Sequence, residues 1–183
     1  TTTRVSIASD GAQANHQSTT SSISAAGRIV TYQSLGSTLV PGDTNALNDV
    51  FVHDRDTGTT TRVSVGTDGT QASSGAGGPT ISANGRFVLF SSGAALTEPD
   101  TNSTSDVFVH DLESRTTTRI SDSGTGAEGN NSSVASSISS DGRYVAYESV
   151  ASNLVPGDTN QLADVFVQDR TTGLTTRISL TSA

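Results

Sequence analysis

Acidic and amide side chains recur in this chain in a fixed pattern, Asp-x-Asn-x-x-x-Asp. The three copies are Asp43, Asn45 and Asp49; Asp100, Asn102 and Asp106; and Asp158, Asn160 and Asp164. Calcium prefers several oxygen ligands, and calcium-binding loops supply them at alternating positions like these. The pattern therefore predicts a calcium ion in each loop. The alternative is that Asp and Asn close turns through Asx hydrogen bonds and that the last Asp starts a strand.

A second set of polar side chains lies in the loops that precede each repeat. Its members that are predicted to bind a ligand are Gln13, Asn15, Gln71 and Asn130. Amide groups both donate and accept hydrogen bonds, so they suit a sugar or a peptide backbone. The alternative is that the Asp-Gly pairs beside them simply make turns.

Residues for acid-base catalysis are few. The histidines are His16, His53 and His110, and Gln168 replaces the strand histidine in the third repeat. His53 and Asp54 are neighbours on a predicted strand, so their side chains point to opposite faces and cannot pair. The chain has no cysteine nucleophile and no G-x-S-x-G elbow. These observations predict a protein that is not an enzyme, with His16 as the one position that breaks the repeat.

The elements that position these residues follow a strict repeat. Arg4, Arg62, Arg119 and Arg177 each close a Thr-Thr-Arg run, at spacings of 58, 57 and 58 residues. A regular period of this length indicates a repeat architecture, here without any helical periodicity. The repeats are predicted at 18–65, 76–122 and 133–180, within one domain over residues 1–183, and residues 1–7 are predicted as an extra outer strand.

Four strands are expected in each repeat, which makes thirteen with the extra strand. In the first repeat they are predicted at 21–24, 28–34, 49–54 and 59–65, and the other repeats follow the same order. The Asn84-Gly85 and Asp141-Gly142 pairs are strong hairpin signals, because both residue types tolerate positive φ. Arg28, Arg86 and Arg143 follow these turns and are predicted to pair with Asp54, Asp111 and Asp169 of the same repeat.

Each repeat contains Ile-Ser-x-x-Gly-Arg-(Ile/Phe/Tyr)-Val followed by Asp-Val-Phe-Val-(His/Gln)-Asp. In these motifs the chain resembles the TolB-like, or WD40-like, β-propeller repeat family over nearly its whole length. The resemblance implies an all-β fold of four-stranded propeller blades. It implies little about function, because propellers serve as scaffolds, lectins and enzymes.

Three blades are fewer than the four to eight that close a propeller. We therefore expect closure by association, most simply a homodimer of six blades that pack through their exposed faces. The alternative is that the chain is a fragment of a longer array.

Composition limits the partners. The ten basic residues are all arginine, and the net charge of −8 argues against nucleic acid, which requires a basic patch. No apolar run is long enough to span a membrane. The absence of methionine favours a processed or excised piece, and the acidic, lysine-free composition favours an extracellular or periplasmic setting.

Together these features predict a non-catalytic extracellular module that binds a protein or glycan through its longer loops and is stabilised by calcium. The alternatives are a hydrolase, or the propeller domain of one, with a site in the central channel, and a structural fragment of a longer propeller.

Overall fold

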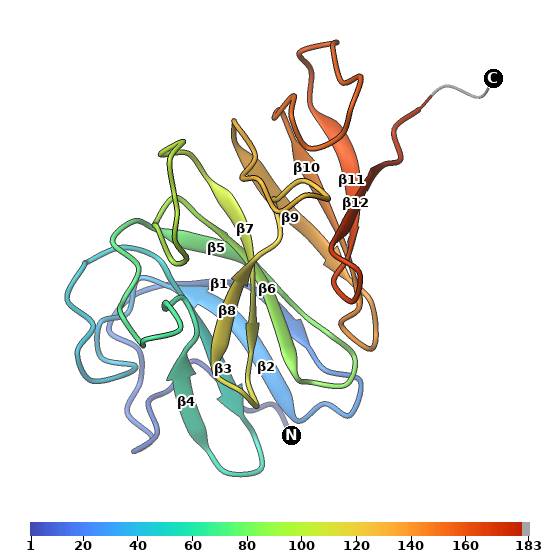
Figure 1. Cartoon of the computed structure of the whole chain (residues 1–183). Helices are drawn as coiled ribbons and strands as arrows, with labels where there is room; N and C mark the ends of the chain where they lie inside the picture. Colours follow the sequence, from blue (N-terminus) through green and yellow to red (C-terminus); the bar gives the residue numbers. More distant parts are fainter. Residues whose placement is uncertain (181–183) are drawn as a thin grey trace.

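The computed structural model describes residues 1–180, which form three four-stranded antiparallel sheets arranged side by side (Figure 1). We call these sheets blades one, two and three. Blade one contains β1 (Ser18–Ile23), β2 (Ile29–Ser34), β3 (Asp49–Asp54) and β4 (Thr59–Arg62). Blade two contains β5 (Ala76–Ile81), β6 (Phe87–Ser92), β7 (Asp106–Asp111) and β8 (Thr116–Arg119). Blade three contains β9 (Ser133–Ile138), β10 (Tyr144–Ser149), β11 (Asp164–Asp169) and β12 (Leu174–Arg177). The expected all-β fold of propeller blades is confirmed.

The strands follow chain order across each blade, from the inner strand to the outer one. The inner strand β5 contacts both β1 and β9, as expected where blades converge. The first hairpin of each blade turns at Gly27, Gly85 or Gly142, whose φ angles of 71°, 77° and 80° favour glycine. The second and third strands of each blade pair in register along their full length.

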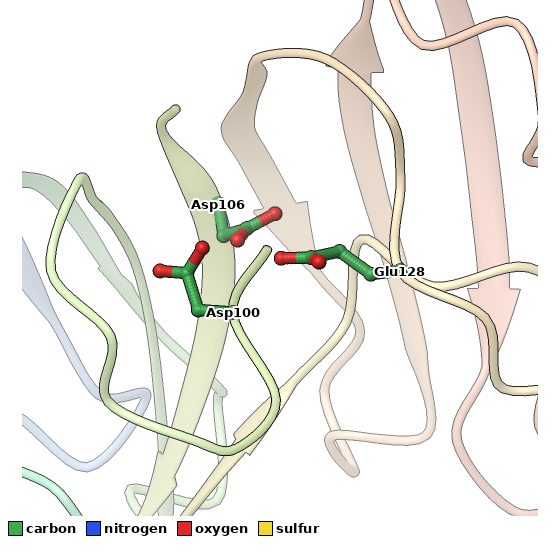
Figure 2. A group of neighbouring side chains, drawn as sticks. All are labelled: Asp100, Asp106 and Glu128. Carbon is green, nitrogen blue, oxygen red and sulfur yellow. The ribbon is translucent and has the colours of Figure 1, made fainter. Parts of the chain in front are cut away.

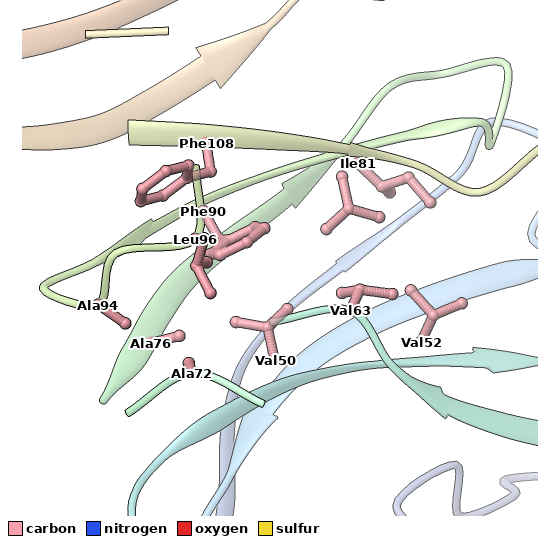
Figure 3. Close-up of a cluster of buried hydrophobic side chains, with 11 residues drawn as sticks. Val50, Val52, Val63, Ala72, Ala76, Ile81, Phe90, Ala94, Leu96 and Phe108 are labelled. Atoms are coloured by element: carbon pink, nitrogen blue, oxygen red, sulfur yellow. The ribbon is translucent and has the colours of Figure 1, made fainter. Parts of the chain in front are cut away.

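Apolar residues of the middle strands form the cores between blades. Val50, Val52 and Val63 of blade one pack against Phe90 and Phe108 of blade two (Figure 3). Leu89, Val107, Val109 and Ile120 on the far face of blade two pack in the same way against blade three. The middle strands of blade two are therefore apolar on both faces because they are buried on both sides.

The prediction of an extra outer strand at residues 1–7 is wrong. These residues form only an isolated bridge, between Ile7 and Gln13. A fourth strand pairs with the third strand of its own blade, and residues 1–180 contain no such partner for this segment. Instead, Val5 packs against the core of blade one, and the Ile7 carbonyl accepts a hydrogen bond of 2.5 Å from Thr60 Oγ1.

The strand count within residues 1–180 is therefore twelve. The fourth strands also end earlier than expected, at Arg62 in blade one and Arg177 in blade three. Over these same residues, no helix is long and apolar enough to cross a membrane.

Candidate functional site

The tight turns of the three blades lie at one end of the strands, which we call the turn face. Here the predicted Arg–Asp pairs are present in every blade. Arg28 donates from Nε and a terminal nitrogen to Asp54 at 3.0 and 2.6 Å. Arg86 makes the same two bonds to Asp111, and Arg143 makes them to Asp169. Such bidentate pairs fix the ends of the second and third strands of one blade against each other.

The arginines of the turn face also change the acidity of their partners. The hydrogen bond from Arg28 lowers the pKa of Asp54 to about 2, and Arg143 has the same effect on the pKa of Asp169. In all three pairs the arginine and the aspartate form their hydrogen bonds with each other. The pairs therefore serve as structural elements of each blade.

The longer loops lie at the opposite end, which we call the loop face. The last Asp of each Asp-x-Asn-x-x-x-Asp copy starts the third strand and is buried there. Asp49 Oδ1 accepts a 2.5 Å hydrogen bond from Ser64 Oγ, which itself accepts the Val50 N–H. Ser121 holds Asp106 and Ser179 holds Asp164 in the same way. These aspartates are thus positioned by a serine just after the fourth strand.

The asparagines of the pattern form the Asx turns that were the alternative to metal binding. The amide oxygens of Asn45, Asn102 and Asn160 each accept the backbone N–H two residues further on. In blades one and three the amide nitrogen faces the aspartate, with Asn45 Nδ2 lying 3.3 Å from Asp49 and Asn160 Nδ2 lying 2.9 Å from Asp164. In this arrangement the asparagines act as donors to the aspartates.

The arginines of the Thr-Thr-Arg runs contact the acidic side chains of the same loops. The sequence patterns did not predict these contacts. Arg62 lies 3.7 Å from both Asp43 and Asp49. Arg177 lies 2.9 Å from Asp158 and 3.3 Å from Asp164. The equal spacing of the arginines and the acidic loops was the signal that the two sets belong together. The calcium prediction for the three loops stays a prediction, but in blades one and three a guanidinium already faces both carboxylates.

The loop cluster of blade two contains more carboxylates. Arg119 binds Asp122 at 2.7 Å and Glu128 at 3.0 Å, while it lies 4.0 Å from Asp106. Glu128 accepts hydrogen bonds from the backbone and hydroxyl of Thr101. Burial raises the pKa of Asp106 to about 6. Figure 2 shows Asp100 of the β6–β7 loop, Asp106 at the start of β7 and Glu128 of the β8–β9 loop brought together. Glu128 was not among the predicted site residues.

The four predicted ligand-binding residues differ in their surroundings. Gln71 is occupied, because its Nε2 donates to Asp43 and Asp49 at 3.0 Å and its Oε1 accepts from Thr44. Asn15 and Asn130 are exposed and join their loops to the neighbouring loop, through Ser37 and Ser152 respectively. Gln13 is exposed and forms the isolated bridge with Ile7. The structure therefore does not gather the four into one site.

The strand histidines are buried and carry structural hydrogen bonds. His53 Nδ1 lies 2.8 Å from Thr60 Oγ1, and His110 Nδ1 lies 2.9 Å from Thr117 Oγ1. Burial lowers the pKa of both histidines. Gln168 takes the equivalent place in blade three and donates to the Ile120 carbonyl at 2.8 Å. Gln168 thus connects blade three directly to the preceding segment. In blades one and two the threonine partners make this connection, because their hydroxyls donate to the carbonyls of Ile7 and Val65.

Two hollows flank the turn at Gly66–Gly69, between blades one and two. The larger, of about 1220 Å³, runs along the outer strands and is lined by charged residues that include Arg28, Arg86 and Arg115. The smaller, of about 550 Å³, lies against the loop residues Ala95–Glu98. Thr67 and Asp68 line both hollows.

Comparisons with known proteins support the fold. No family model and no curated protein matches the chain. Among solved structures, a putative TolB from Agrobacterium tumefaciens is 19% identical with a TM-score of 0.50, over 85% of this chain and 47% of that one. A prolyl endopeptidase structure is 15% identical with a TM-score of 0.53, over 88% and 22% of the two chains. The tricorn protease is 16% identical with a TM-score of 0.50, over 84% and 14%.

The chain thus spans less than half the length of each of these proteins. At such identities the matches show the fold alone, and they confirm the TolB-like β-propeller architecture that the repeat motifs indicate.

Proposed function

We propose that this protein is a non-catalytic propeller module that binds a protein or glycan ligand at its loop face. The observation that carries the proposal is the smaller hollow, because it lies between the β4–β5 loop and the β6–β7 loop at the loop face. Its wall contains hydroxyls, carboxylates and the amide of Gln71, which suit the hydrogen-bonding surface of a sugar or a peptide. Loops on a rigid scaffold are the usual place for such recognition.

A hydrolase is less well supported by the contacts. His53 and His110 are buried, and their threonine partners donate to backbone carbonyls of the preceding segment. A general base must reach the proton that it removes from substrate. His53 is 4% exposed, and His110, although it borders the larger hollow, is 5% exposed with its Nδ1 held by Thr117. His16 is exposed, and its Nδ1 accepts the Gln17 N–H.

The ligand proposal is tested with a glycan array and a panel of fluorogenic peptides. We expect binding to a subset of glycans or to a peptide without turnover, and at least tenfold weaker binding by Asp68→Ala, because this side chain borders both hollows. Leu162→Ala, a change on an exposed loop of blade three, is the control. Turnover that is lost in His16→Ala would contradict a non-catalytic role.

We also propose that the module closes its ring with a second copy of itself. The two end blades expose apolar positions that are buried between blades elsewhere in the chain. Ile178 is 55% exposed on blade three, whereas its equivalent Ile120 is 1% exposed. Ile23 is 55% exposed on blade one, whereas its equivalent Ile81 is 6% exposed. Because equivalent faces already pack together twice within the chain, the free faces suit each other in a six-blade dimer.

Light scattering after size-exclusion chromatography tests this association. We expect a particle of twice the 18.6 kDa chain mass, and a monomer for Ile178→Asp. Leu162→Asp is the control, because Leu162 is exposed outside the face that contains Ile178. A wild-type monomer would contradict closure by self-association and would leave the open faces to further blades of a longer chain.

An extracellular or periplasmic setting, favoured by composition, is part of the same proposal.

A further inference from the structure

One position distinguishes the loop clusters at the two blade junctions. Gln71 lies between blades one and two, and Glu128 takes the equivalent place between blades two and three. Their equivalence is shown by the isolated bridges Val65–Gln71 and Asp122–Glu128. The difference replaces an amide that donates hydrogen bonds with a carboxylate that only accepts them.

The replacement leaves one oxygen of Asp106 without a donor. In blade one, Asp49 Oδ2 accepts hydrogen bonds from Gln71 and Asn45. In blade two, Glu128 has no N–H to donate, and Asn102 Nδ2 donates to the Gly129 carbonyl at 2.6 Å instead. Asp106 is 1% exposed, and its buried Oδ2 has no hydrogen-bond partner among residues 1–180, with Arg119 Nη1 4.0 Å away. A buried, unpartnered carboxylate oxygen is costly, so this oxygen requires a proton or a cation.

The charges around this oxygen favour a cation. Oxygens of Asp100, Asp106 and Glu128 all lie within 4.8 Å of one another (Figure 2). Asp106, Asp122 and Glu128 lie within 4.0 Å of the guanidinium of Arg119, and Asp100 adds a fourth carboxylate beside Asp106 and Glu128. In blades one and three, by contrast, two loop carboxylates face one guanidinium. Blade two therefore carries an excess of negative charge that the other blades do not.

We infer that Asp100, Asp106 and Glu128 bind a divalent cation that prefers oxygen ligands, such as calcium. The ion joins the β6–β7 loop of blade two to the β8–β9 loop that leads into blade three. Calcium accepts carboxylate ligands in flexible geometry, which suits side chains from two loops. This site differs from the pattern predicted from the sequence, because it is confined to one blade and uses Glu128 in place of an asparagine. It does not depend on the proposed ligand or on ring closure.

Calorimetric titration of the chelator-treated full chain with calcium chloride at neutral pH tests the inference. We expect one calcium ion per chain and a rise in the thermal unfolding midpoint, because an ion that binds only the folded state stabilises it. Glu128→Gln, which installs the residue that blade one carries, is expected to weaken calcium binding at least tenfold. The reciprocal change Gln71→Glu is expected to create a second binding event.

Glu148→Gln is the matched control, because it makes the same chemical change at an exposed strand position. Circular dichroism of each variant serves to check that it is folded. Two outcomes would overturn the inference: no calcium binding by the folded wild type at millimolar concentrations, or unchanged affinity in folded Glu128→Gln. Either would mean that the carboxylates share a proton instead.

Discussion

The turn face and the loop face use the same pair of residue types differently. On the turn face one Arg–Asp arrangement occurs in all three blades with nearly the same distances. On the loop face the arginines meet two carboxylates in blades one and three but a larger acidic cluster in blade two. A contact repeated in every blade stabilises the repeat itself, whereas a departure in one blade marks a place where that blade does something additional.

The largest expected effect is at the loop face of blade two. Arg119→Ala is expected to lower the free energy of unfolding by about 3 to 5 kcal/mol, because it removes the guanidinium that faces the buried Asp106 and its neighbours Asp122 and Glu128. Urea unfolding measures the change. Arg4→Ala, in the equivalent Thr-Thr-Arg run but exposed, is the control and should change stability little. A loss below about 1 kcal/mol for Arg119→Ala would show that the cluster does not rely on this guanidinium.

A smaller effect is expected at the turn face, where blades two and three meet. A Cβ at Gly142 would overlap the ring of Phe87, and the residue has a φ of 80°. Gly142→Ala is therefore expected to cost about 2 to 4 kcal/mol, from backbone strain and overpacking together. In the equivalent Gly27→Ala the added Cβ would make only ordinary contacts, at 3.6 Å or more, so the change should cost about 1 kcal/mol from backbone strain. If thermal or urea unfolding showed the same loss of stability for both variants, the contact of Gly142 with Phe87 would not stabilise the packing of blade three on blade two.

The smallest effect is expected for a single turn-face pair, and it depends on pH. Because the pKa of Asp54 is lowered to about 2, the pair with Arg28 stabilises the fold above the ordinary aspartate pKa of about 4. That contribution is lost as the pH falls through about 2. Arg28→Ala should therefore lower the unfolding midpoint slightly at pH 6 and leave it equal to that of the wild type near pH 2.

Thermal unfolding followed by circular dichroism between pH 6 and pH 2 measures this difference. Arg55→Ala is the control, because Arg55 donates to the Gly27 carbonyl, which does not titrate. If the difference between Arg28→Ala and wild type stayed constant with pH, the ion pair would not be its cause.

Local patterns in the sequence were enough to predict the blades and the turn-face pairs. Arg28 follows one tight turn and Asp54 precedes another, so antiparallel pairing of β2 and β3 places them together at Ile29↔Asp54. The Asx turns also follow from neighbouring residues alone, since Asn45 bonds the N–H of Leu47. The error at residues 1–7 has the opposite cause, because a strand needs a partner that the local sequence does not reveal.

The tertiary structure decided the contacts between distant segments. Gln71 reaches Asp43 and Asp49 across a blade junction, and Glu128 reaches Asp100 and Asp106 across the next. Which loop meets which depends on how adjacent blades are stacked, and this is set by burial of the valines and phenylalanines between them. The sequence by itself thus determined the repeating blade and its internal pairs, while only the packing of blade on blade decided where negative charge accumulates.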